Sequence, residues 1–202
     1  MNILVFLHEV SLSNRQLEQF FQLYAVVPEQ LTTNLAGEWT TLLTSQFLHG
    51  GWWHLISNMV FLWVFGNNIE ERLGHFKYLI FYLACGALAA LCQWFIGMYS
   101  EIPSLGASGA ISGVLGAYII RFPHARITTL IFLGFFATTI SVPAMLMIGI
   151  FFVQNVISGL ASLQAAANMS VEAGGVAYWA HIGGFVFGMI LAPLFGLFRR
   201  DY

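Results

Sequence analysis

Long stretches without any formal charge limit what this chain can fold into. Five such runs cover residues 52–69, 78–100, 102–120, 127–171 and 173–198. A helix needs about 20 apolar residues to cross the hydrocarbon core of a bilayer. Only 8% of all residues are charged, against about 25% in an average soluble domain. The pattern therefore predicts an all-α, polytopic membrane protein rather than a soluble enzyme.

The amino-terminal end fits this pattern less well. Residues 2–7 are apolar, but Glu9 follows at once, so this segment is too short to span. Two interpretations stay open: a truncated first helix of a six-helix core, whose gene continues upstream in frame, or an interfacial segment of a five-span protein. Ser13 is placed to cap a short amphipathic helix that ends before Pro28. Residues 29–51 are expected to form a loop at the membrane surface. The predicted parts are residues 1–28, 29–51 and 52–200.

Charge and one proline resolve the 45-residue uncharged run at 127–171. Pro143 suits the first turn of a helix, so we expect a surface connection over residues 127–142 and one helix over about 143–160. This topology places six of the seven basic residues on one side, which the positive-inside rule makes cytoplasmic together with the C-terminus. They are Arg72, Lys77, Arg121, Arg126, Arg199 and Arg200. We expect the plasma (inner) membrane as the location.

Three polar residues then fall at one depth. The helices expected to start near residues 52, 104 and 176 all run from outside to inside, and His54, Ser108 and His181 each lie within about their first two turns. A serine in a membrane helix usually bonds its own backbone, but an ionisable residue there is a functional candidate. The predicted site therefore lies just below the outer surface.

Ser108 and His181 form the minimal unit for nucleophilic catalysis, because an imidazole can take the proton of an attacking hydroxyl. Glycines at 109, 113, 116, 184 and 188 favour close approach of their helices. No carboxylate lies near His181, and Asp201 is at the opposite membrane face. The residues thus predict a Ser–His dyad without an acidic third member.

Acyl transfer also requires donors for the oxyanion. The Ser108 backbone N–H at a helix N-terminus, His54 and the Asn58 amide are the candidates. His54 and Asn58 are four residues apart and share one helix face. Interhelical hydrogen bonding is the simpler alternative for Asn58, and His49 is expected to be structural.

Other classes of protein fit less well. A net charge of −2 offers no basic surface for nucleic acid. A transporter that uses His54 and His181 lacks a repeated half and buried carboxylates. A metalloprotease built on His49, His54 and His181 lacks an H-E-x-x-H motif. We therefore expect neither metal nor cofactor, and we interpret Cys85 and Cys92 as small core residues.

These motifs together resemble the rhomboid family of intramembrane serine proteases. Its GxSG pattern matches residues 106–109, its HxxxN pattern residues 54–58, and its AHxxGxxxG pattern residues 180–188. The match covers about residues 42–198 and includes residues 71–74. Two positions depart from many members: Thr40 follows Trp39 where arginine is common, and Ser112 stands where some members have a tyrosine that stacks on the histidine.

The resemblance implies an intramembrane endopeptidase in which Ser108 is the nucleophile and His181 the general base. His54 and Asn58 would help to bind the oxyanion. The partners would be the lipid bilayer and transmembrane segments of other proteins, unwound near a small residue. Residues 143–175 would correspond to a mobile helix and cap loop at the substrate entrance. A catalytically silent, helix-binding member of the same fold is the alternative.

Overall fold

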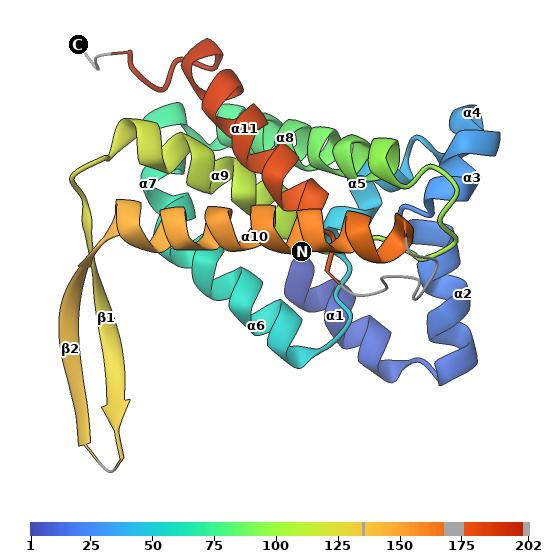
Figure 1. Ribbon diagram of the computed structural model, residues 1–202, viewed down its shortest axis with the longest axis horizontal. Coiled ribbons are helices and arrows are strands. Elements are labelled where there is room, and N and C mark those ends of the chain that lie inside the picture. Colours follow the sequence, from blue (N-terminus) through green and yellow to red (C-terminus); the bar gives the residue numbers. More distant parts are fainter. Residues whose placement is uncertain (135, 168–175, 200–202) are drawn as a thin grey trace.

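The structure, a computed structural model, describes residues 1–134, 136–167 and 176–199, which form a helical bundle with one β-hairpin (Figure 1). The predicted all-α membrane fold is confirmed in its main features. The helices are α1 (Asn2–Ser11), α2 (Asn14–Tyr24), α3 (Pro28–Thr33), α4 (Leu35–Glu38), α5 (Thr41–Thr44), the 3₁₀ turn η1 (Ser45–Phe47), α6 (Trp52–Phe61), the π turn η2 (Leu62–Gly66), α7 (Asn67–Leu73), α8 (His75–Ile96), α9 (Ser108–Arg121), α10 (Ala144–Ala167) and α11 (Tyr178–Leu194). The strands are β1 (Arg126–Leu133) and β2 (Phe136–Pro143).

Helix α9 forms the centre of the bundle. Residues 109–118 are all buried, as expected for a helix that is apolar and small-sided on every face. The core around it draws on α7, α8, α10 and α11, with Phe81 of α8 and Phe185 of α11 among its larger members. The first residue of α9 is Ser108, so this central helix fixes where the predicted nucleophile lies.

Glycines bring α9 and α11 into backbone contact. A Cβ atom added at Gly184 or Gly188 would overlap the carbonyl groups of Gly109 and Gly113, respectively. In the other direction, a Cβ at Gly116 would overlap the carbonyl of Phe185. Such small-residue faces let helices pack closely within a membrane. The spacing between α9 and α11 is therefore set by main-chain atoms rather than by flexible side chains.

Two of the described helices are long and apolar enough to cross a membrane by length and composition: α8 and residues 144–165 of α10. A single helix after residue 143 is confirmed by α10, but Pro143 is the last residue of β2 rather than part of the helix, and the helix runs to Ala167 rather than to about residue 160. The uncharged run at 102–120 divides into an extended segment and α9, so the helix begins at Ser108 rather than near residue 104. The last helix begins at Tyr178 rather than near residue 176.

The connection between α9 and α10 is an antiparallel hairpin, which the sequence analysis did not foresee. Leu130 pairs with Thr139, and Thr129 pairs with Ile140. β-Branched and aromatic residues favour strands, and Gly134 adopts a positive φ of 63° in the turn. Figure 1 shows the hairpin leaving the bundle where α9 ends and α10 begins, across the direction of those helices.

The amino-terminal third supports the segment that leads into α9. Ser13 caps α2 through a capping box with Gln16, as predicted. The region expected to be a loop instead contains the short helices α3, α4 and α5 and the turn η1. It is tied to the chain before α9, because Val26 and Ser104 exchange backbone hydrogen bonds and the Gly106 N–H donates to the Ser45 carbonyl at 2.9 Å.

Candidate active site

Ser108 opens α9 two residues after Gly106, whose backbone conformation favours glycine. Gly106 has a φ of 125°, a backbone conformation that side-chain-bearing residues rarely adopt. A Cβ there would also lie only 2.7 Å from Cε1 of His54. Because the first-turn amides of a helix have no intrahelical acceptor, the backbone N–H of Ser108 remains a potential donor. The turn thus brings the hydroxyl and the backbone N–H of Ser108 close to the ring of His54.

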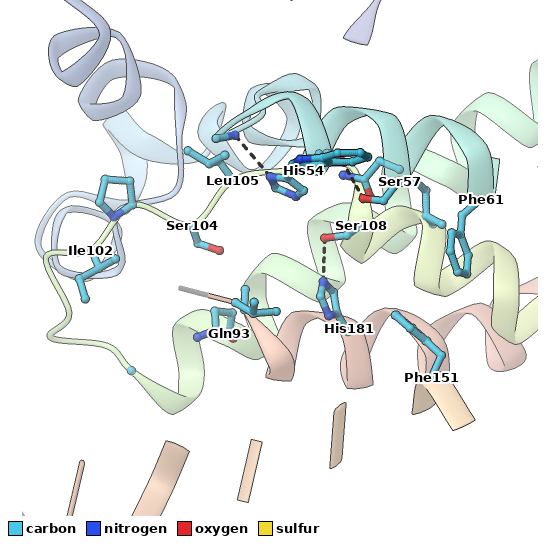
Figure 2. Close-up of a pocket in the computed structure, with 18 of the residues that line it drawn as sticks. His54, Ser57, Phe61, Gln93, Ile102, Ser104, Leu105, Ser108, Phe151 and His181 are labelled. Atoms are coloured by element: carbon cyan, nitrogen blue, oxygen red, sulfur yellow. Dashed lines mark hydrogen bonds between the residues drawn. The ribbon is translucent and has the colours of Figure 1, made fainter. Parts of the chain in front are cut away.

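His181 faces Ser108 from the first turn of α11. Its Nε2 lies 2.7 Å from Ser108 Oγ, and His181 as a whole is only 8% exposed. Figure 2 shows the side chains of Ser108 and His181 pointing toward each other. The two residues that the sequence analysis paired are therefore within hydrogen-bond distance.

The second ring nitrogen of His181 contacts a residue that the sequence analysis missed. Nδ1 lies 2.7 Å from Oδ1 of Asn155 in α10, and the ring of Phe151, one turn earlier, lies 5.8 Å from the imidazole between centroids. Ser112, at the position of the family tyrosine, instead donates to the Ser108 carbonyl at 2.8 Å. The available signal was a pair of adjacent amides, Gln154 and Asn155, within a mostly apolar helix, since such residues often bond across helices.

His54 and Asn58 both lie on α6 and both line the same cavity as Ser108. The Gly50 N–H donates to Nδ1 of His54 at 3.3 Å, so Nδ1 is the acceptor and Nε2 carries the hydrogen. Asn58 is 6% exposed, and its Nδ2 has no hydrogen-bond partner among the described residues. Buried donors are almost always satisfied, and Asn58 lines the cavity, so its amide is a candidate donor to a bound group.

The cavity has a volume of about 700 Å³. Its walls come from α6, α9, α10 and α11, from the end of α8, and from the extended segment before α9. Figure 2 shows Ser104 and Leu105 of that segment, with Phe61 and Phe151 at the other end. This volume is typical of ligand-binding pockets, which measure about 300–1,000 Å³, and Ser108 and His181 both belong to the lining.

His49 lies beside this cavity but outside its lining. Its backbone N–H is 3.3 Å from each carboxylate oxygen of Glu9, and its ring centroid is 5.2 Å from that of His54. Burial, and secondarily the neighbouring His54, lower the pKa of His49 to about 4. The side chain is therefore neutral at pH 7. Among the described residues, no three His, Cys, Asp or Glu side chains gather as metal ligands would.

Comparison with known proteins matches the Rhomboid domain model to residues 36–198. The chain is 29% identical to Rhomboid protein 1, mitochondrial, of Saccharomyces cerevisiae, over 85% of this chain and 45% of that protein. It is 42% identical to Rhomboid protease GluP of Bacillus subtilis, over 41% of this chain and 16% of that protein. It is 34% identical to Rhomboid-like protein 11, chloroplastic, of Arabidopsis thaliana, over 51% of this chain and 36% of that protein.

The chain spans less than half the length of each of these relatives. The family model, by contrast, covers most of the chain and contains every site residue described above. The resemblance that the motifs suggested is thereby confirmed. The chain belongs to the rhomboid family of integral membrane proteins, many of which are intramembrane serine proteases.

Proposed function

We propose that the chain is an intramembrane serine endopeptidase that cleaves transmembrane segments of other membrane proteins through a Ser108–His181 dyad. The observation that carries the proposal is the 2.7 Å contact between Ser108 Oγ and His181 Nε2 at the wall of the cavity. A serine hydroxyl is a weak nucleophile near neutral pH and needs a base within hydrogen-bond reach. Helix packing alone does not require a serine and a histidine in contact beside an open cavity.

The reaction follows from the atoms that face the cavity. Ser108 Oγ attacks the scissile carbonyl carbon while its proton passes to His181 Nε2. The resulting imidazolium protonates the leaving amine, which breaks the C–N bond and leaves an acyl-serine. Water then attacks the ester carbonyl while its proton passes to His181 Nε2. The imidazolium returns this proton to Ser108 Oγ as the ester C–O bond breaks, which releases the carboxylic acid and restores the hydroxyl. No metal or cofactor enters these steps.

Three donors are available for the negative charge that develops on the carbonyl oxygen. They are Nε2–H of His54, the unpartnered Nδ2 of Asn58 and the first-turn N–H of Ser108. Donors that are fixed before the reaction stabilise a developing oxyanion without reorganisation. The amide of Asn58 is the donor that mutation tests most simply, because its side chain can be removed without touching Ser108 or His181.

The substrate class follows from the setting. Rhomboid proteases act on transmembrane segments within the bilayer, and the Ser108 side chain meets a cavity rather than a closed helix interface. A helix must unwind locally before its carbonyl can be attacked, because its backbone groups are otherwise bonded to each other. By the positive-inside rule the site faces the outer side of the plasma (inner) membrane and the C-terminus is cytoplasmic.

A fluorophosphonate probe tests the proposal most directly. Purified protein in detergent should be labelled at Ser108, and both Ser108→Ala and His181→Ala should abolish labelling and cleavage of a transmembrane substrate. Absence of labelling and of cleavage in the folded parent protein would support a catalytically silent, helix-binding member instead. Cleavage that survives Ser108→Ala would reject the dyad.

A further inference from the structure

Asn155 is a buried amide in the middle of the apolar helix α10. It is 6% exposed, and its two functional atoms have different partners. Nδ2 lies 2.8 Å from the carbonyl oxygen of Phe151 in the same helix. Oδ1 lies 2.7 Å from Nδ1 of His181. An amide in this position carries a desolvation cost, which both bonds offset.

These two bonds determine where the hydrogen of His181 resides. The Phe151 carbonyl can only accept, so the NH₂ group of Asn155 must face it and Oδ1 must face the imidazole. Oδ1 can only accept as well, so Nδ1 of His181 carries the hydrogen and donates. In a neutral imidazole the other nitrogen then has a free lone pair. That nitrogen, Nε2, accepts the hydroxyl hydrogen of Ser108.

The opposite tautomer cannot act as a base toward Ser108. With its hydrogen on Nε2, the imidazole would donate to the serine oxygen and could not take the serine proton. In serine proteases with an acidic third member, that carboxylate holds the base in the correct tautomer, and the loss of this control is expensive. The described residues offer His181 no carboxylate partner; its ring nitrogens contact Asn155 and Ser108.

We propose that Asn155 is a positioning residue that holds His181 in its Nδ1–H tautomer and fixes the plane of its ring. The Phe151 ring, one turn away, packs against the same imidazole. Because both residues belong to α10, the base on α11 has its active tautomer only while α10 is packed against it. This inference rests on the proposed dyad for its catalytic meaning, but the tautomer itself is measurable without catalysis.

Substitution at residue 155 should act on turnover more than on binding. Asn155→Leu keeps the side-chain size but removes the acceptor. It should lower kcat roughly 10–100-fold with KM nearly unchanged, by analogy with the partners that orient metal-binding histidines. General-base catalysis as a whole contributes about 10²–10⁴-fold, which bounds the loss. The neighbouring Gln154 is exposed on the same helix. Gln154→Leu is therefore the matched control and should change kcat less than twofold.

Asn155→Asp provides a rescue. A carboxylate retains an acceptor for Nδ1–H, and a protonated carboxyl reproduces the whole amide pattern, with C=O facing His181 and O–H facing the Phe151 carbonyl. It should therefore recover most of the activity that Asn155→Leu loses. If the leucine variant does not fold, Asn155→Ala carries the same comparison. Equal kcat values for the parent, the variant without the acceptor and the aspartate variant would overturn the inference.

The decisive measurement is the ¹⁵N spectrum of protein labelled in histidine, with His181→Gln used to assign the His181 signals. The parent protein should show the hydrogen on Nδ1, and Asn155→Leu should show an increased share on Nε2. An unchanged tautomer in the folded variant would refute the inference, even if Ser108 still reacts with fluorophosphonate. If the parent protein fails to react at all, the proposed function fails, while the spectra still decide the role of Asn155.

Discussion

Gly184→Ala tests whether the backbone contact between α9 and α11 sets the distance between nucleophile and base. Gly184 lies three residues after His181, and the atoms that would obstruct its new Cβ belong to Gly109, next to Ser108. The Cβ would lie 3.1 Å from the Gly109 carbonyl carbon, closer still to the carbonyl oxygen, and 3.3 Å from Cβ of Ala89. A main-chain carbonyl cannot rotate away as a long side chain can.

The size of the effect follows from these contacts. Ordinary carbon contacts are about 3.5–4.0 Å, so α11 must move away from α9 by roughly 1 Å at this point. Ser108 Oγ and His181 Nε2, now 2.7 Å apart, would then exceed the range of about 2.6–3.2 Å needed for proton transfer. A misplacement of this size costs about 10²-fold in rate. Overpacking should also lower the stability by about 1–3 kcal/mol.

The assay compares Gly184→Ala with Gly149→Ala in α10. A Cβ at Gly149 meets no described atom within 4 Å, so that variant should keep its activity and gain up to about 1 kcal/mol from helix propensity. Fluorophosphonate labelling rates measure the site, and thermal unfolding in detergent measures the fold. A folded Gly184→Ala protein that labels Ser108 at the parent rate would refute the argument.

Three further predictions address single residues. Asn58→Ala should lower kcat by up to about 10²–10³-fold with little change in KM; lower stability at unchanged specific activity would make Asn58 structural. Ser108→Ala and His181→Ala should each abolish cleavage, and the double variant should be scarcely worse than either. The pKa of His49 is about 4 in the fold and about 6.5 unfolded. Its contribution to stability is therefore complete above pH 6.5 and is lost progressively as the pH falls toward 4. Thermal unfolding measured between pH 6.5 and pH 4 should therefore show a smaller loss of stability for His49→Gln than for the parent protein.

The sequence allowed much of the fold to be predicted because membrane helices leave a simple signal. Uncharged runs and Pro143 predicted the single helix α10, and Ser13 predicted the cap of α2. The hairpin escaped notice because a threonine-rich stretch between two helices reads equally well as a surface connection. Its strands depend on pairing with each other, as between Thr129 and Ile140, and such pairing is weakly encoded in any one segment.

The candidate site was predictable where a residue's chemistry is unusual for its setting. A histidine in an apolar helix is conspicuous, and Ser108, His181, His54 and Asn58 indeed line one cavity. Asn155 was not predicted, because its role depends on which face of α10 meets α11. A run that is apolar all round has no periodic pattern that would reveal this face. The contact with His181 became visible only once the helices were placed.

Distance and orientation in this site have separate structural origins, and the difference has a measurable consequence. Backbone contact at Gly184 sets how far His181 lies from Ser108, whereas Asn155 on α10 sets which nitrogen carries the hydrogen. Both act on one proton transfer. Once that transfer is lost through distance, the tautomer has no further effect, so Gly184→Ala combined with Asn155→Leu should be no slower than Gly184→Ala alone. Multiplied losses would instead mean that Asn155 acts on something other than His181, since independent sites add in free energy.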